Sequence, residues 1–489
     1  MSELQSWFRS PLVARQLMAG IGWERDANTR DVLDRRDLLS QPALVGRVLR
    51  RRREPGSGPQ PVATLPFPKD DGTFRTTCVL DPFDDLWYSM LASVACPSIN
   101  SALPAIDVVL STRFIPESSG AFGAEGWRDA KKRRGASVDR SGAKPIGGFD
   151  VEQHYGTVST AGVAQLLNSC LAPSWLVGEF EEFHQGLSAW PGTPPGILVG
   201  PMASAAFGTL ALLPVDRVLQ RSSVRFERWV DDITVEVRDE KHFADVRDAV
   251  DEQLRLGGQR LNPEKSWFES KAEEEPSQSE SIPNSEHDGD EISVEALQEA
   301  VEAKDGRRTR YQLASLGGRP GLDAAPFVIS CDDVWVLAPK YAGDYLFRRQ
   351  KELTSEQLEQ IVERFCRPVT RESASATTHG CRVLSRRRVP AAMGQRLFDA
   401  ADVAATGPYR AVSPALYLAS SLSKEKPRVR QERCIEKTFV LGDLNCQRGL
   451  IAGLCYDTRP KSAEAGLTAI ERVSADLRPT VAWVRSGKS

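Results

Sequence analysis

Two adjacent aspartates, Asp231 and Asp232, stand in the segment RWVDDITV, between stretches in which apolar and polar residues alternate. Two carboxylates this close repel each other, and apolar neighbours remove part of their hydration, so the pair is costly unless a cation compensates the charge. A divalent metal ion supplies that compensation. An Asp-Asp pair alone is more often a solvated turn than a metal site, so other segments must decide between the two interpretations.

A third carboxylate, Asp150, ends an expected strand over residues 144–151. The alternation over residues 225–237 predicts a β-hairpin with both adjacent aspartates at its turn. An aspartate at the end of one strand, beside a hairpin that carries two more, supplies three hard oxygen donors of the kind that Mg²⁺ prefers. Such a set suits the two-metal mechanism of phosphoryl transfer.

Three further segments have residues that can contact a nucleotide. Tyr155 follows Asp150 by five residues; its ring can lie under a sugar and exclude a ribose 2′-hydroxyl, or simply pack between a strand and a helix. Gly196 and Gly200 allow the backbone to approach a ligand closely. Lys265 ends the turn LNPEK, where its ammonium is available to a phosphate or to leaving pyrophosphate. Ordinary packing and turn chemistry also explain each segment taken separately.

Residues 63–80, ATLPFPKDDGTFRTTCVL, predict two short strands about an Asp-Gly turn, with Lys69 and Arg75 on the hairpin. Residues 81–100 have apolar side chains at helical spacing and predict a buried helix. Beyond about residue 320 the pattern is helical. One of these helices is expected to begin with a capping box and to continue with an apolar face: Thr354 and Gln357, then Leu358, Ile361, Val362 and Phe365.

The net charge of −3 is unevenly distributed. Between residues 273 and 302 the chain has 11 acidic residues and no Lys or Arg, which leaves a net charge of +8 for the rest. The acidic segment has too few apolar side chains to offset the entropy cost of ordering it, which predicts disorder. The basic remainder can meet nucleic-acid phosphates, although runs of Arg and Lys are equally typical of a solvated surface.

The length of 489 residues is enough for several domains of about 100–200 residues each. The nine cysteines form no C-x-x-C pair, so neither a zinc module nor a disulfide framework is indicated. The chain has no apolar stretch of the ~18–20 residues that span a membrane, and its first residues lack the order of a signal peptide. We therefore expect a soluble, cytoplasmic protein.

The segments PFPKDDGTFR, FDVEQHY, GILVGPMAS, RWVDDITV and LNPEK, in this order, resemble the successive motifs of reverse transcriptases over about residues 60 to 270. The resemblance implies an α+β fold, in which the fingers and palm of a right-hand polymerase, with an antiparallel palm sheet and helices, precede an all-helical C-terminal domain. Four regions follow from it: 1–100, N-terminal helices and fingers; 101–270, palm; 271–305, acidic disordered insert; 306–489, helical thumb-like domain.

The resemblance also implies a role for each site residue. The catalytic and metal-binding groups are Asp150, Asp231 and Asp232, with the backbone carbonyl of Val151 as a further metal ligand. The nucleotide-binding residues are Lys69, Arg75, Tyr155 as the steric gate, Gly200 and Lys265. Trp229 stands where the family usually has Tyr, and is expected to pack beside the primer end. The segment Gly196–Gly200 lacks the usual Gln, which removes a polar contact to the nucleotide.

The activity implied is RNA-directed DNA polymerisation, in which two Mg²⁺ ions, for which Mn²⁺ can substitute, assist transfer of deoxynucleotides from dNTPs to a 3′-hydroxyl. The expected partners are an RNA template, such as a dedicated noncoding RNA, and the DNA product; a homo-oligomer is compatible with the resemblance. The chain looks most like bacterial defence-associated and abortive-infection reverse transcriptases. Template-independent or protein-primed synthesis, a catalytically silent RNA-binding scaffold and an unrelated two-metal hydrolase remain as alternatives.

Overall fold

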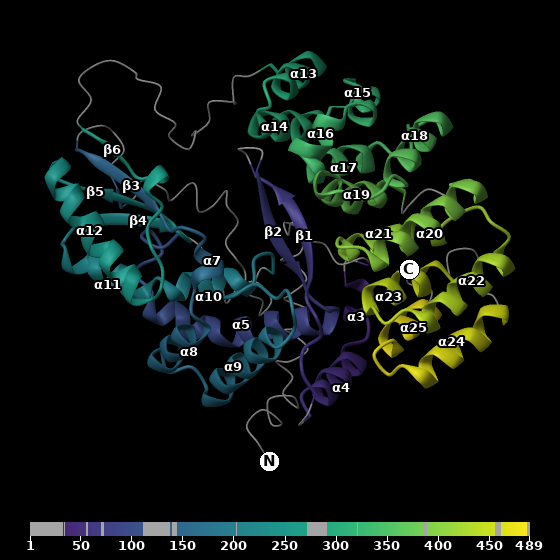
Figure 1. Ribbon diagram of the computed structural model, residues 1–489, viewed down its shortest axis with the longest axis horizontal. Coiled ribbons are helices and arrows are strands. Elements are labelled where there is room, and N and C mark those ends of the chain that lie inside the picture. Colours follow the sequence, from purple (N-terminus) through teal and green to yellow (C-terminus); the bar gives the residue numbers. More distant parts are fainter. Residues whose placement is uncertain are drawn as a thin grey trace. The chain divides into compact units, whose positions relative to one another are not determined.

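The computed structural model describes residues 33, 35–54, 57–69, 73–110, 137–138, 144–201, 203–270, 291–319, 321–384, 389–454 and 461–486. Figure 1 traces the chain, which divides into two compact units. The first unit contains Leu49–Val62 and Phe83–Gln278, and the second contains Asn28–Val48, Ala63–Pro82 and Ser279–Ser489. None of the helices in these described stretches is both long and apolar enough to cross a membrane.

The first unit contains a four-stranded antiparallel sheet, in the order β4-β5-β3-β6. The strands are β3 (Ile146–Asp150), β4 (Arg225–Trp229), β5 (Asp232–Glu236) and β6 (Trp267–Glu269). The strand expected to end at Asp150 and the hairpin expected over residues 225–237 are therefore confirmed. One detail differs: of the two adjacent aspartates only Asp231 lies in the turn, because Asp232 already pairs with Trp229 as the first residue of β5.

Apolar side chains of the sheet form one core with two helices of the same unit, α11 (Leu213–Arg221), which precedes β4, and α12 (Glu240–Leu256), which follows β5. The amphipathic pattern of α12 buries one face of the helix, and Asp239 caps its N-terminus by accepting a hydrogen bond from the backbone N–H of His242. The core contains side chains from both kinds of element: Phe149, Ile233, Val235, Val215, Leu219, Phe243, Val246, Val250 and Leu254.

Two glycines in β3 allow aromatic rings to lie directly against the strand. A Cβ atom on Gly147 would lie 2.3 Å from the ring of Phe243, and one on Gly148 would lie 2.3 Å from Nε1 of Trp267. Because successive residues of a strand face opposite sides of the sheet, the two rings cover opposite faces of β3. The glycines therefore make room for the Phe243 ring of α12 and the Trp267 ring of β6 against the strand that ends at Asp150.

The rest of the first unit is helical. Its helices are α5 (Pro82–Ala102, whose first residue belongs to the second unit), α7 (His154–Thr157), α8 (Thr160–Ser169), α9 (Ser174–Ser188) and α10 (Ala203–Ala211); a short 3-10 helix, η2, spans Pro263–Lys265. The buried helix expected over residues 81–100 is thus confirmed. The ring of Tyr88 on α5 stacks on Phe183 and Phe207, at centroid distances of 5.3 and 5.4 Å, which joins α5 to α9 and α10.

The regular elements in the described part of the second unit are one two-stranded hairpin and a series of helices. The hairpin, β1 (Ala63–Pro68) and β2 (Phe74–Val79), is antiparallel, as the sequence predicts. The helices are α3 (Arg36–Leu39), the start of α4 (Pro42–Arg52), α13 (Val294–Glu302), α14 (Gly306–Leu316), α15 (Ala325–Ser330), α16 (Asp332–Leu337), α17 (Pro339–Arg348), α18 (Ser355–Phe365), α19 (Arg371–Leu384), α20 (Ala391–Thr406), η3 (Arg410–Val412), α21 (Ser413–Ser421), α22 (Pro427–Val440), α23 (Leu444–Gly453), α24 (Lys461–Val473) and α25 (Arg478–Arg485).

Side chains of α19 hold the hairpin within this unit. The His379 ring meets Phe67 of β1 edge-on at 6.3 Å, and the Arg371 guanidinium lies 5.3 Å above the ring of Phe74 on β2. The capping box at the start of α18 and the buried apolar face that follows it are both confirmed.

A buried ion pair joins the N-terminal and C-terminal segments of the second unit. Asp37 of α3 accepts two hydrogen bonds from the Arg448 guanidinium of α23, at 2.8 and 2.5 Å, and one from the Thr480 hydroxyl of α25, at 2.5 Å. Neither Asp37 nor Arg448 has any exposed side-chain surface. Segments more than 400 residues apart in sequence are therefore joined by charge-assisted hydrogen bonds.

The expectation of disorder over residues 271–305 is wrong for its last part. Residues 294–302 form α13, and Ser293 caps it by accepting a hydrogen bond from the N–H of Ala296. The helix buries four apolar side chains at helical spacing: Ala296, Leu297, Ala300 and Val301. This short stripe offsets the cost of ordering the helix, although the acidic composition of the whole segment conceals it. Residues 271–290 lie outside the described part of the chain.

Candidate active site

The structure brings the three predicted aspartates to one end of the sheet. Asp150, the last residue of β3, lies directly opposite Asp232, the first residue of β5. Asp231 precedes Asp232 in the turn that joins β4 to β5. Opposed residues of an antiparallel pair have Cα atoms about 4.5–5.5 Å apart. Carboxylates from two separate parts of the sequence are therefore close neighbours.

The pKa of Asp231 shows how unfavourable its negative charge is in this position. Burial, and next the negative charge of Asp150, raise the pKa of Asp231 from its usual 3.8 to about 6. The ammonium of Lys265 lowers it, but by less than these two effects raise it. The site therefore has an excess of negative charge that a cation would stabilise.

Lys265 supplies the counter-charge for Asp150. Its Nζ lies 3.1 Å from Oδ2 of Asp150, and its side chain is 63% exposed, so it can move away without breaking the core. The turn that carries it is fixed to β3, because the backbone N–H of Asn262 donates to the Asp150 carbonyl at 2.8 Å. The Asn262 side chain also accepts from the N–H of Glu264, which shapes the short helix η2.

Within the described residues, no group of three or more His, Cys, Asp or Glu side chains stands in an arrangement ready to hold a metal ion. The donor chemistry nevertheless fits Mg²⁺, because carboxylates are hard oxygen donors and the negative charge of Asp150 raises the pKa of Asp231. In this structure the Lys265 ammonium is the cation beside Asp150.

Tyr155 lies in α7, immediately after the strand that carries Asp150, and is held on two sides. Its carbonyl accepts from the N–H of Ile197 at 3.0 Å. Gly196, at φ +76°, comes so close that a Cβ atom there would lie 2.5 Å from the same carbonyl. A Cβ atom on Gly208 of α10 would lie 3.0 Å from the Tyr155 ring. The ring is half-buried, so part of it remains accessible to a ligand.

Sequence reasoning missed the buried histidine beside Tyr155. His154 Nε2 lies 3.1 Å from the carbonyl of Gly208, and Nδ1 lies 3.0 Å from the side-chain nitrogen of Gln259. Burial lowers the pKa of His154 to about 4. A neutral ring satisfies both contacts if Nε2 donates and Nδ1 accepts. His154 therefore fixes α7, and with it Tyr155, against α10; nothing in the sequence around it indicates this role.

The remaining predicted residues fall into two groups. Val151, Trp229 and Gly200 belong to the first unit: Val151 is buried and forms a bridge to Leu261, Trp229 pairs with Asp232, and Gly200 has φ +120° in the loop before α10. Lys69 and Arg75 are exposed on the β1–β2 hairpin, which belongs to the second unit. Their action together with the aspartates stays a prediction.

A second missed feature is an ion pair without any exposed side-chain surface, between Arg228 of β4 and Asp216 of α11. Arg228 Nε and Nη2 donate to the two carboxylate oxygens of Asp216, each at 2.7 Å. Arg228 stands only three residues before Asp231. The sequence does place a charged residue, Arg228, at an inward-facing position of the expected strand, which indicates a buried charge. Its partner cannot be identified from spacing in the sequence.

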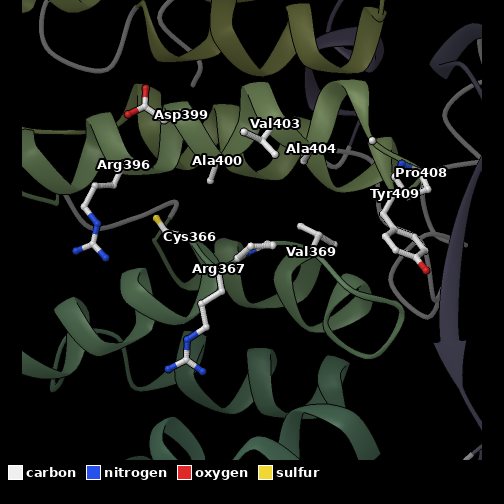
Figure 2. A pocket seen from close by; sticks show the side chains of 12 residues that line it. Cys366, Arg367, Val369, Arg396, Asp399, Ala400, Val403, Ala404, Pro408 and Tyr409 are labelled. Carbon is white, nitrogen blue, oxygen red and sulfur yellow. The ribbon is translucent and has the colours of Figure 1, made fainter.

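The second unit has a cavity of about 440 Å³ that contains none of the predicted site residues (Figure 2). Apolar side chains such as Val369 and Val403 line it, together with Arg367, Arg396 and Tyr409. Asp399 and Arg396 both come from α20 and carry opposite charges, and their side chains point in opposite directions (Figure 2). The lining residues therefore do not select one kind of ligand.

No family model matches this chain, and no curated protein matches it in sequence. Among solved structures, telomerase from Candida albicans in complex with a fragment of telomeric RNA is similar at 12% sequence identity and a TM-score of 0.32. The match covers 89% of this chain and 70% of the telomerase chain. Apo telomerase from Candida tropicalis is similar at 10% identity and a TM-score of 0.34, and the match covers 88% of this chain and 70% of the telomerase chain.

Proposed function

We propose that this chain is an RNA-directed DNA polymerase that transfers deoxynucleotides from dNTPs to a 3′-hydroxyl. The observation that carries the proposal is the placement of Asp150 opposite Asp232, with the half-buried Asp231 beside them. Five motifs in the order found in reverse transcriptases add to it. A solvated Asp-Asp turn, the ordinary alternative, would not require a third carboxylate from a separate strand or a raised pKa at Asp231.

In this proposal Asp150 and Asp231, with the carbonyl of Val151, hold two Mg²⁺ ions, or Mn²⁺ in their place, and Asp232 completes the ligand shell. Bound there, the ions would supply Lewis-acid chemistry, a lowered pKa of the attacking hydroxyl and stabilisation of the charge on the leaving pyrophosphate. Lys265, which pairs with Asp150 in the structure and is largely exposed, would contact the phosphates. Lys69, Arg75 and Gly200 bind the triphosphate, and Trp229 packs beside the primer end.

The template in this proposal is RNA, such as a dedicated noncoding RNA, and the biological role is bacterial defence against phage. Both rest on the resemblance in sequence, and neither requires a different catalytic site. Purification of the protein together with its bound nucleic acid, followed by sequencing of that RNA and of the DNA made with dNTPs and Mg²⁺, would identify template and product. A DNA product that is not complementary to the bound RNA would favour template-independent synthesis.

Primer extension with Asp150→Asn tests the polymerase activity. We expect purified wild-type protein to extend a primer on an RNA template with Mg²⁺ and dNTPs, and the variant to lose this activity. Asp248→Asn is the matched control, because Asp248 is an exposed carboxylate on α12 and should leave extension unchanged. Undiminished extension by Asp150→Asn would refute the assignment. Release of mononucleotides without extension would instead indicate a hydrolase.

Tyr155→Val tests the steric gate. We expect the variant to accept ribonucleotides in place of deoxynucleotides about 10-fold or more better than wild type, because the half-buried ring is removed from beside the sugar. An interaction difference of about 1.4 kcal/mol gives a factor of 10 in this ratio. Competitive incorporation of rNTPs and dNTPs measures it. Unchanged discrimination, with normal dNTP incorporation, would mean that Tyr155 serves only for packing.

A further inference from the structure

The turn that carries Asp231 has an unfavourable backbone conformation. β4 ends at Trp229 and β5 begins at Asp232, so the turn contains only Val230 and Asp231. Val230 has φ +53°, in the left-handed region that β-branched residues avoid and that two-residue hairpin turns usually fill with Asn or Gly. Contacts from the surroundings must therefore hold this turn in place.

The Arg228 guanidinium makes such a contact. Its Nη1 donates to the carbonyl of Val230 at 3.0 Å. Its Nη2 donates to the carbonyl of Thr209, near the end of α10, at 2.9 Å. The same group is held by both carboxylate oxygens of Asp216, in the first turn of α11. One side chain thus joins the turn to two helices.

The strand position of Arg228 is fixed as well. The backbone N–H of Arg228 donates to the carbonyl of Val108 at 2.8 Å, and its carbonyl accepts from the N–H of Leu110 at 2.9 Å. On the other edge of β4, Arg228 pairs with Ile233 of β5. The guanidinium therefore starts from a rigid backbone, which is what a side chain needs in order to position another group accurately.

Stability alone does not explain this ion pair. Both side chains are completely buried, and a buried ion pair can often be replaced by apolar residues of similar volume without loss of stability. What apolar residues cannot replace is the hydrogen bond to the Val230 carbonyl, because they have no donor. The specific contribution of Arg228 is thus the conformation of the turn.

We propose that Arg228, oriented by Asp216, is a positioning residue that holds the Val230–Asp231 turn so that Asp231 can bind the catalytic metal ions. The inference rests on the proposed function and deepens it. Without Arg228, the Val230 carbonyl loses a hydrogen bond that helps to hold this conformation, and the Asp231 carboxylate moves from its place near Asp150. Loss of groups that orient metal ligands lowers metal affinity or activity by about 10- to 100-fold.

The test uses the double variant Arg228→Met with Asp216→Leu, which removes both buried charges and leaves neither without its partner. We expect thermal unfolding close to that of wild type, Mn²⁺ affinity about 10- to 100-fold lower by electron paramagnetic resonance, and a similar fall in kcat with KM for dNTP unchanged. Arg228→Lys is the second variant. It keeps the charge but has no planar fork to reach both Asp216 and the turn, so it should show the same loss.

The matched control is Asp37→Leu with Arg448→Met, an equally buried ion pair in the second unit. We expect this variant to bind Mn²⁺ as wild type does. If both Arg228 variants are folded and bind Mn²⁺ with wild-type affinity, the positioning role is refuted and the proposed function stands. If wild-type protein binds no Mn²⁺ and extends no primer, the proposed function fails and this inference fails with it.

Discussion

Asp231→Asn is expected to lower the rate of nucleotide incorporation on the order of 10³-fold and, at the same time, to raise the melting temperature of the metal-free protein. The loss of rate follows because the amide cannot replace an ionised metal ligand, and metal ions contribute several kcal/mol to stabilising the transition state, at about 1.4 kcal/mol per factor of ten. Single-turnover primer extension with Mg²⁺ measures this part of the prediction.

The gain in stability follows from the pKa of Asp231, which is about 6 in the folded chain against its usual 3.8. The folded state therefore binds this proton more tightly than the unfolded state does. Above pH 6 the side chain must be charged in an unfavourable place, which lowers the stability of the folded state; as the pH falls from 6 toward 4 this penalty disappears. The neutral amide has no such penalty, so the variant should melt higher than wild type at pH 8.

Melting curves of both proteins between pH 4.5 and 8, without divalent metal, test this prediction. We expect the difference in melting temperature to be largest at pH 8 and to shrink steadily as the pH falls from 6 to 4.5. Mg²⁺ should stabilise wild type more than the variant. A variant that melts below wild type at pH 8 would show that the Asp231 carboxylate stabilises the metal-free fold, contrary to the pKa argument.

Asp37→Ala is expected to destabilise the second unit by about 3–5 kcal/mol. The substitution removes the carboxylate partner of the Arg448 guanidinium, which has no exposed surface. Removal of one partner of a buried ion pair is strongly destabilising, because the remaining charge stays buried without compensation. The substitution also removes the acceptor of the Thr480 hydroxyl. Urea unfolding, followed by limited proteolysis with cleavage sites mapped in each unit, measures the effect.

The control for Asp37→Ala is the double variant Asp37→Leu with Arg448→Met. Removal of both charges should restore most of the lost stability, because no unpaired buried charge remains. Equal destabilisation by the single and the double variant would contradict this interpretation and would mean that packing, not charge, is what these positions contribute.

The sequence predicted those parts of the site that depend on local pattern. Strand periodicity and turn chemistry act over a few residues, so the strand ending at Asp150 and the hairpin with Asp231 at its turn could be predicted together. Their direct opposition in the sheet could be expected only from the resemblance to a family, because strand register depends on the whole sheet.

The supporting contacts could not be predicted, for physical reasons. Arg228 and Asp216 lie 12 residues apart on a strand and a helix, and the same two charges would be exposed in many other packings. The sequence around His154 likewise does not distinguish it from an ordinary exposed polar residue, and its burial follows from packing against α10. The apolar face of α13 does not stand out from the sequence, because the surrounding acidic segment, taken as a whole, has few apolar residues. In each case tertiary packing decides the state of a side chain that has no distinctive local pattern.

The second unit is built from stretches that are far apart in the sequence, and this affects its folding during synthesis on the ribosome. Residues 28–48 and the hairpin emerge early, but their packing partners in α19, α23 and α25 emerge only with the last part of the chain. The first unit, by contrast, is complete once Gln278 has left the exit tunnel. A nascent chain therefore carries an unpacked hairpin while the roughly 290 residues between Val79 and Arg371, the first residue of α19, are translated, a period in which unpaired strand edges are open to chaperones or to misassembly.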